Sequence, residues 1–471
     1  MVQTGVFLAT LFLTLTSFSA MPIATGTQAA PGSRYAQLAR DIFKELIEIN
    51  TTDSGGSTTQ AAEAIAVRLR AAGFPPADVQ VLGPDSRKGN LVARLRGTAA
   101  HKPILLLAHL DVVEAHREDW SVDPFKFLEQ DGYFYGRGTS DIKSGCAILA
   151  ANLIRMKEEG FQPDRDLIVA LTADEEGGNF NGVDWLLKNR RSLIDADYCL
   201  NLDGGGGAIK DGKYLLNELQ TSEKAYLSFR LEVTDRGGHS SLPVKDNAIY
   251  RLASGLTRLA QSEFPIMLNE TTRAYFERMS RIEGGQTGRD MMALLASPPD
   301  PEAAARLAET PLYNAQMRTT CVATKLEAGH ADNALPQRAR ALINCRLIPE
   351  DSPEGVRKTL EGILADNRIT VTPLNEARVG PRSTIVREVM EPAERITSEI
   401  WPGVPVIPVM STGGTDGLYL RMAGMPTYGI SGVFHDINDI RIHGKDERIG
   451  VKEFFDGMEF MYRLVKALSQ P

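Results

Sequence analysis

The sequence contains few cysteines and no strong excess of one charge, and each shortage excludes a class of protein. Four cysteines among 471 residues, none in a Cys-x-x-Cys pair, cannot build a disulfide-rich miniprotein. The formal net charge is −8 and no basic run occurs, so nucleic acid is not an expected partner. Hydrophobic residues at 43% and charged residues at 24% exclude a disordered chain and a collagen-like fibre. At about 150 residues per domain, the length predicts two to three domains.

Long apolar runs are also scarce. Only residues 6–20 approach membrane length, and they are shorter than the ~20 residues that a spanning helix needs. Small residues follow, and Thr27-Gln28-Ala29 fits a cleavage site, so residues 1–29 are interpreted as a secretory signal peptide. Because this segment contains no Lys or Arg, the alternative is an uncleaved membrane anchor. A cleaved chain is expected in the periplasm or outside the cell, where disulfides are permitted.

Three short apolar runs indicate strands that are buried on both faces. They cover residues 103–108, 167–171 and 198–202, and helical patterns such as residues 143–159 alternate with them. Each run is followed within three residues by acids or histidine: His109-Leu110-Asp111, Asp174-Glu175-Glu176 and Asp203-Gly204-Gly205. In an open α/β sheet the active site lies beyond the carboxyl ends of the strands. We therefore expect an α/β catalytic domain with a mostly parallel sheet and a site at those ends.

A second pattern begins near Ser222. Residues 226–234, 319–326, 338–347 and 369–373 are predicted strands, and residues 246–261 and 354–366 are predicted helices. This order predicts a small α+β domain with one antiparallel sheet. Because the chain from about Asn375 returns to buried runs, the smaller domain is inserted into the larger one. The predicted plan is signal peptide 1–29, catalytic domain 30–221 and 375–471, and inserted domain 222–374.

The acids and histidines at the strand ends predict a metal site. Each has an ordinary alternative: a surface pair for His109 and Asp111, a helix N-cap for Asp141, solvated loop charge for Glu175 and Glu176, and a turn for Asp203. Together, however, these groups repel or stay unpaired unless a cation collects them. A donor set of Asp, Glu and His without Cys suits zinc, cobalt or manganese. The surplus of acids favours two metals that share a carboxylate, with one further carboxylate to accept a proton.

Six sequence elements resemble the family of aminoacylases, carboxypeptidase G and succinyl-diaminopimelate desuccinylase. They are His109-Leu110-Asp111, Gly138-Thr139-Ser140-Asp141, Glu175-Glu176, Asp203, Gly238-His239-Ser240-Ser241 and His443-Gly444-Lys445-Asp446-Glu447. Their order and spacing are intact from about residue 33 to 468. The resemblance implies a di-zinc exopeptidase fold whose inserted domain serves as a lid and for dimerisation.

The resemblance also implies a set of metal ligands. One zinc ion would be held by His109 and Asp203, a second by Glu176 and His443, and Asp141 would bridge them.

Two further residues beside the ligands receive roles from the same resemblance. Glu175 would be the general base, and Asp111 would orient His109 through its second ring nitrogen.

On the substrate side, the resemblance implies that Arg346 grips a substrate carboxylate, a task that suits its planar fork. The alternative for Arg346 is a surface ion pair. Asn333 and Gly414 match family positions near the substrate. His239 resembles the histidine that reaches across a homodimer to stabilise the oxyanion, and the alternative is a loop histidine held by Ser240 or Ser241.

The leading functional hypothesis is a secreted zinc exopeptidase for dipeptides or short peptides, because the Asp203 ligand resembles the peptidase branch. The alternative is a metal-dependent amidohydrolase of N-acyl amino acids or other small amides. A binding protein without catalysis is a third hypothesis, but a spare carboxylate such as Glu175 argues against it.

One disulfide is predicted from strand geometry. Cys321 and Cys345 lie almost equally far from a turn centred between Asp332 and Asn333. Opposed residues of an antiparallel pair are close enough for a bridge. Cys146 and Cys199 fall in predicted core segments and are expected to be free.

Overall fold

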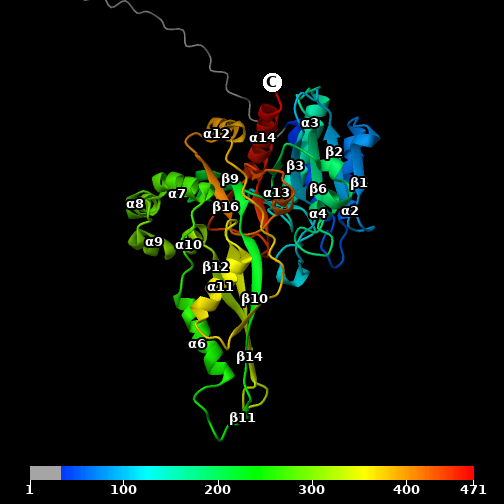
Figure 1. The fold of residues 1–471 in the computed structure, drawn as a ribbon. Helices are drawn as coiled ribbons and strands as arrows, with labels where there is room; N and C mark the ends of the chain where they lie inside the picture. Colours follow the sequence, from blue (N-terminus) through cyan, green and yellow to red (C-terminus); the bar gives the residue numbers. More distant parts are fainter. Residues whose placement is uncertain (1–32, 471) are drawn as a thin grey trace, which may run out of the picture.

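The computed structural model describes residues 33–470. A body built on a ten-stranded sheet carries an elongated arm, which consists of β10 to β15 with helices α6 and α11 (Figure 1). The predicted signal peptide lies outside the described residues. Among the described residues, no helix has both the length and the apolar character that a membrane span requires.

The sheet of the body is mostly parallel, as predicted. Its strand order is β1-β2-β6-β3-β7-β17-β9-β8-β18, with β16 paired to β9. Parallel pairs join β3 to β6 and β7, β17 to β7, β16 to β9 and β18 to β8. The strands are β1 (Val79–Leu82), β2 (Asn90–Leu95), β3 (Ile104–His109), β6 (Leu167–Thr172), β7 (Tyr198–Asn201), β8 (Gly206–Lys210), β9 (Lys213–Glu223), β16 (Val406–Ser411), β17 (Thr427–Gly429) and β18 (Phe434–Asp436).

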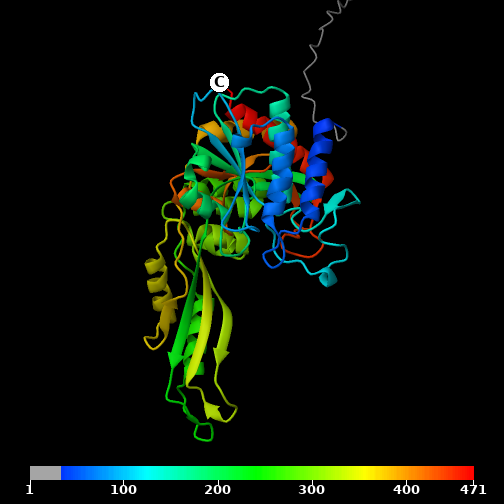
Figure 2. The ribbon, with the colours of Figure 1, turned by 90° about the vertical axis from the view of Figure 1, so that its right-hand side faces the viewer.

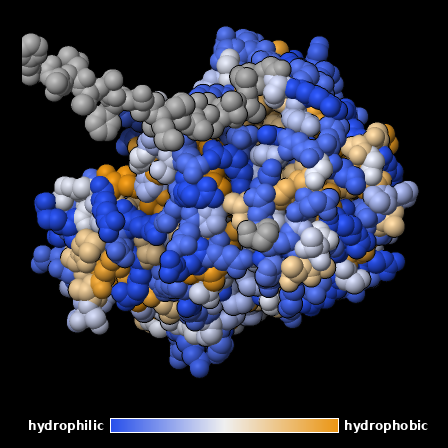
Figure 3. Space-filling model, turned by 90° about the horizontal axis from the view of Figure 1, so that it is seen from above, coloured by the Kyte–Doolittle hydropathy of each residue, from blue (hydrophilic) through white to orange (hydrophobic). Residues whose placement is uncertain are grey.

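Helices cover both faces of this sheet, which explains why its central strands are continuous apolar runs. Along β3, Leu106 and Ala108 enter one core and Leu105 and Leu107 enter the other. The first core is closed by α1 (Arg34–Glu48), α2 (Thr58–Ala71), α3 (Lys143–Glu158), α12 (Arg387–Ile400) and α14 (Val451–Leu468). The second is closed by α4 (Gly182–Asn189), α5 (Arg191–Ile194) and α13 (Gly417–Met422). The face shown in Figure 3 is largely hydrophilic, with apolar residues in small scattered patches.

The arm has the predicted strand and helix order. Its four strands are antiparallel in the order β12-β14-β10-β15, and α6 and α11 close the core on one face. A short pair, β11 and β13, forms the end that is farthest from the body (Figures 1 and 2). The elements are β10 (Ala225–Thr234), β11 (Gly238–His239), α6 (Ala248–Gln261), β12 (Thr320–Ala328), β13 (Ala334–Leu335), β14 (Arg338–Leu347), α11 (Pro353–Leu364) and β15 (Thr370–Pro373).

Four helices between α6 and β12 were not predicted. They are α7 (Glu270–Glu283), α8 (Gly285–Leu294), α9 (Pro301–Ala308) and α10 (Pro311–Met317). They share a core with β9 and β16 of the body, where Phe276 and Met291 pack with Leu216 and Ile407. The domain boundaries at residues 222 and 374 stay a prediction, and the chain between them contributes to the body as well as to the arm.

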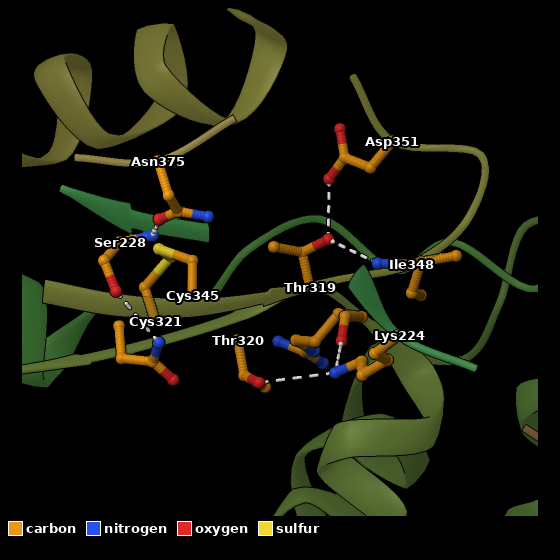
Figure 4. The surroundings of a disulfide bond; sticks show 11 residues. Lys224, Ser228, Thr319, Thr320, Cys321, Cys345, Ile348, Asp351 and Asn375 are labelled. Atoms are coloured by element: carbon orange, nitrogen blue, oxygen red, sulfur yellow. Dashed lines mark hydrogen bonds between the residues drawn. A yellow bond between two sulfur atoms is a disulfide. The ribbon is translucent and has the colours of Figure 1, made fainter. Parts of the chain in front are cut away.

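The root of the arm contains a buried lysine and the predicted disulfide (Figure 4). Lys224 stands between β9 and β10, and its Nζ donates to the carbonyl oxygen of Arg318 at 2.8 Å and to Oγ1 of Thr320 at 3.3 Å. Burial lowers the pKa of Lys224 to about 7. Cys321 and Cys345 are direct partners across β12 and β14 and form a disulfide, which confirms the prediction.

Thiol counting tests this bridge. Denatured, unreduced protein should show the two thiols of Cys146 and Cys199, and reduced protein should show four. Replacing both bridged cysteines by Ala should lower the free energy of unfolding by about 3 kcal/mol, because a loop with a sequence separation of 24 is released in the unfolded chain. Four thiols before reduction would contradict the bridge.

Candidate metal centre

The structure brings all five predicted metal ligands together. His109 is the last residue of β3, Glu176 follows β6 and Asp203 follows β7, so the parallel strands deliver them to one edge. Asp141 precedes α3, and His443 lies on the segment between β18 and β19 (Arg448–Gly450). They form two groups, His109 with Asp141 and Asp203, and Asp141 with Glu176 and His443.

The carboxylate of Asp141 is common to both groups. Its Oδ1 lies 3.0 Å from Nε2 of His109, and its Oδ2 lies 3.0 Å from Nε2 of His443. In the first group Asp203 Oδ1 is 3.7 Å from His109 Nε2, and in the second Glu176 Oε1 is 2.9 Å from His443 Nε2. One oxygen of Asp141 thus faces each group, which is the arrangement of a bridging carboxylate.

Asp111 fixes the ring of His109 through its backbone. Nδ1 of His109 is 3.0 Å from the carbonyl oxygen of Asp111, whereas the Asp111 carboxylate is 3.6 Å away. Because Nδ1 donates to this carbonyl, the lone pair of Nε2 faces Asp141 and Asp203. The carboxylate of Asp111 accepts hydrogen bonds from the backbone N–H groups of Glu175 and Glu176, at 3.1 and 2.9 Å. It therefore holds the loop after β6 against the end of β3.

The cluster is rich in negative charge, and its residues differ in exposure. His109 is buried, the carboxylates of Asp141, Glu175, Glu176 and Asp203 are half-buried, and His443 is exposed. Burial and the nearby Asp203 carboxylate raise the pKa of Glu175 well above its ordinary value. Burial and Asp141 raise the pKa of Glu176 to about 7. The hydrogen bond to Asp141 raises the pKa of His443 to about 9. A divalent cation in each group would relieve this repulsion, and the imidazole and carboxylate donors fit zinc, cobalt or manganese.

Glu175 is an acid beside the two groups that belongs to neither of them. Its carboxylate is close enough to Asp203, His109 and Asp416 for their charges to act on its pKa. Asp416 is itself buried and accepts hydrogen bonds from Thr172 at 2.7 Å and from Asn181 at 2.5 Å. A carboxylate beside two ligand groups, yet outside both, is available to exchange a proton.

Glu447 positions Asp141, a role that the sequence interpretation did not assign to it. Its Oε1 accepts hydrogen bonds from the backbone N–H groups of Ser140 and Asp141, at 2.6 and 3.0 Å. Its Oε2 accepts from the backbone N–H of Gly138 at 2.9 Å and from Arg137 at 2.7 Å. Both Arg137 and Glu447 are buried. The sequence signal was present, since Glu447 ends the motif that contains His443, but its partners lie about three hundred residues away.

The predicted substrate residues lie apart from one another in a single chain. Arg346 is at the end of β14 near the body, with its guanidinium 5.0 Å from the Tyr226 ring centre. Asn333 was expected near the same pocket, but it lies next to β13 at the far end of the arm, where its carbonyl oxygen accepts from the N–H of Ser240 at 3.0 Å. Gly414 is exposed, and a Cβ added there would contact nothing within 4 Å.

His239 is also at the far end of the arm, in β11 (Figure 1). Its Nδ1 lies 2.8 Å from Oγ of Ser241 and accepts from the N–H of Ser241 at 3.1 Å. His239 is therefore held by Ser241, as its alternative role as a loop histidine predicts. His239 belongs to neither ligand group of its own chain.

Replacing Glu447 by Gln tests its positioning role. The variant leaves Arg137 buried without a charged partner, and breaking a buried pair costs about 3–5 kcal/mol of unfolding free energy. Zinc affinity, measured by competition with a chelator, should fall about 10–100-fold because Asp141 is less well held. The control is Glu391→Gln in the exposed pair with Arg387, where about 0–1 kcal/mol is expected. Equal effects of the two substitutions would contradict the role of Glu447.

Known proteins resemble this chain in sequence and in fold. The profile of "Peptidase family M20/M25/M40" matches residues 105–467. The chain is 29% identical over 387 residues to the N-fatty-acyl-amino acid synthase/hydrolase PM20D1 of Homo sapiens, covering 78% of this chain and 74% of the relative. It is 28% identical over 373 residues to a probable carboxypeptidase S-like protein of Dictyostelium discoideum, covering 78% and 71%.

Solved structures agree on the fold. The M20 metallo-carboxypeptidase Sso-CP2 of Sulfolobus solfataricus superposes with a TM-score of 0.65 at 18% identity, covering 92% of this chain and 99% of that one. The YXEP protein of Bacillus subtilis, described as a dinuclear metal-binding M20 peptidase, gives a TM-score of 0.57 at 11% identity, with 92% and 98% covered. The chain belongs to peptidase family M20/M25/M40 and is a metallo-hydrolase of that family.

Proposed function

We propose that this enzyme hydrolyses the amide bond of N-acyl amino acids with two metal ions bound. The observation that carries the proposal is the shared carboxylate of Asp141, with one oxygen toward each ligand group, and Glu175 outside both groups. The similarity to the N-fatty-acyl-amino acid synthase/hydrolase over 78% of the chain favours this substrate class over dipeptides.

Exposed apolar residues on the segments that carry Glu176 and His443 support an acyl substituent. Ile437, Ile440 and Ile442 are between 42% and 63% exposed on the segment that leads to His443. Phe180, on the loop that follows Glu176, is 44% exposed. Apolar surface next to polar ligands is typical of a site that receives an apolar group.

The two ligand groups support the following metal-binding roles. His109 and Asp203 would hold one ion and Glu176 and His443 the other, with Asp141 between them; zinc is the metal we propose, and cobalt and manganese suit the same donors. Ions bound there supply Lewis-acid activation of the amide carbonyl and of a water molecule.

Within the protein, Glu175 would take the proton from the attacking water at its carboxylate and pass it to the leaving amine. Arg346 would bind the carboxylate of the amino acid through its two terminal nitrogens, and Gly414 would leave room for the substrate backbone. Asn333 would act near the substrate together with His239.

A second candidate is the exopeptidase reaction on dipeptides or short peptides. The similarity to a carboxypeptidase S-like protein and the Asp203 ligand favour it. The two substrate classes share the amide bond and the carboxylate, so the same residues would serve both.

We also propose a homodimer in which His239 serves the site of the partner. β12 is the edge strand of the arm sheet, and its Val322 and Leu326 are exposed, which favours pairing with a second copy. The position of His239 at the far end of the arm suits a residue that acts outside its own chain. The disulfide and the predicted signal peptide support a periplasmic or secreted location.

The proposed function is tested with zinc-loaded protein on a matched panel. N-acetyl and N-decanoyl derivatives of one amino acid should show a higher kcat/KM than dipeptides with that amino acid at the carboxyl end, and chelation should abolish all turnover. Faster hydrolysis of the dipeptides would contradict the proposal and favour the exopeptidase reaction. No hydrolysis of any amide would revive the hypothesis of a binding protein.

The proton-transfer role is tested by two neighbouring substitutions. Glu175→Gln should retain both metals by elemental analysis and lose about 10²–10⁴-fold in kcat. Glu176→Gln should bind less metal, because it removes a ligand oxygen. Near-full activity of Glu175→Gln would refute the assignment.

Mixing inactive variants tests the role of His239. Loss of one oxyanion donor typically costs about 10²–10³-fold in kcat, so His239→Ala should be nearly inactive. After subunit exchange, His239→Ala and Glu175→Gln together should recover part of the activity, because one site of the hybrid contains both an intact base and an intact donated histidine. Exchange without recovery would place His239 outside the partner's site.

A further inference from the structure

A cavity of about 280 Å³ opens directly beside the ligand Asp203. It lies between the ends of β9 and β16 and the helices α7 and α10, which the sequence did not predict. Besides Asp203, its lining includes Glu218, Gln316, Tyr275, Leu312 and Met410. The inference drawn from this cavity rests on the proposed hydrolysis, since the cavity adjoins the metal centre.

Glu218 presents an unpaired carboxylate to this cavity. It belongs to β9, with Leu216 two residues before it on the side of the strand that packs against α7. Within residues 33–470, no side chain or backbone N–H donates a hydrogen bond to its carboxylate, and no Lys, Arg or His forms an ion pair with it. Burial raises the pKa of Glu218 to about 7, and its charge adds to the burial that raises the pKa of Tyr275.

Gln316 adds a second unpaired acceptor. Its side chain is buried, and its Nε2 donates to the carbonyl oxygen of Met410 at 2.7 Å. Because this contact identifies Nε2, the other atom of the amide is the acceptor Oε1, which is buried without a partner among the described residues. A buried acceptor without a donor costs about 1–3 kcal/mol, so the cavity favours an occupant that donates hydrogen bonds over an apolar one.

We propose that this cavity binds a cationic group of the substrate, a primary ammonium or a guanidinium, with Glu218 as its counter-ion and Gln316 as a second acceptor. No Lys, Arg or His is part of the lining, so the substrate must bring the positive charge. Leu312, Val409 and Met410 offer apolar contact to the methylene stem of such a group. A purely apolar chain would leave both acceptors unpaired, and it fits the exposed isoleucines near His443 better.

The cationic group can belong to the amino acid or to the acyl part of the substrate, and two matched pairs separate these sources. The first pair is Nα-acetyl-L-lysine and Nα-acetyl-L-2-aminoheptanoate. The second is 6-aminohexanoyl-L-alanine and heptanoyl-L-alanine. Each pair exchanges only an ammonium for a methyl group. In zinc-loaded wild-type protein, the charged member of one pair should have at least about tenfold higher kcat/KM, since a site built for a polar group rejects the analogue that lacks it.

Variants assign this preference to the cavity. Glu218→Gln, which keeps the size of the side chain, should reduce the preference to about twofold or less, and Gln316→Met should reduce it by a smaller factor. The control Glu302→Gln, at an exposed acid of α9, should retain the wild-type ratio. A wild-type protein that prefers the uncharged member of both pairs, or a preference that survives Glu218→Gln, would overturn the proposal.

Binding separates this proposal from the proposed function. If the zinc-loaded protein hydrolyses no amide, the proposed function fails, and calorimetry then decides on the cavity. Tighter binding of the charged member of a pair to wild type than to Glu218→Gln would support the cation site even then. Equal binding of both members to both proteins would refute it.

Discussion

Mutual repulsion among carboxylates near the ends of β3, β6 and β7 governs how the surrounding loops are held. Asp141, Glu175, Glu176 and Asp203 meet in a half-buried space, and within residues 33–470 the ion pairs of these acids are with His109 and His443. Such a cluster is stable only if cations or protons enter it. The surrounding backbone therefore has to hold like charges together while leaving their oxygens free to bind.

Two buried carboxylates supply this backbone restraint. Asp111 accepts two backbone N–H groups of the loop after β6, and Glu447 accepts three from the loop before α3. Neither belongs to a ligand group. Their hydrogen bonds are charge-assisted and shielded from water, so each holds its loop more firmly than a neutral side chain would. Asp111 and Glu447 thus fix the loops that carry the candidate ligands Glu176 and Asp141.

The same sheet edge joins the two ligand groups to the cavity beside Asp203. Asp203 belongs to a ligand group and also lines the cavity that contains Glu218 and Gln316. Helices α7 and α10 close that cavity by packing on β9 and β16. A change in these helices would therefore alter the shape of the cavity without a change in the loops that carry the two ligand groups.

Features that depend on local pattern were predictable from the amino-acid sequence. Apolar runs followed by His109, Glu176 and Asp203 predicted the parallel strands and the candidate ligands at their ends. A run of apolar residues indicates a buried strand, and the residues that follow the run lie at the carboxyl end of that strand. The disulfide between Cys321 and Cys345 was predictable, because two antiparallel strands joined by a turn place residues at equal distances from that turn opposite each other.

Which distant side chains meet became visible only in the folded chain. In the structure, Glu447 accepts a hydrogen bond from the backbone N–H of Asp141, and α7 to α10 pack on the body sheet. Gln316 and Glu218 line the same cavity. Asn333 lies at the far end of the arm, whereas Arg346 lies near the body. These contacts join residues about sixty to three hundred positions apart, and no local periodicity encodes them. They arise because buried polar groups and apolar helix faces find partners through the packing of the whole chain.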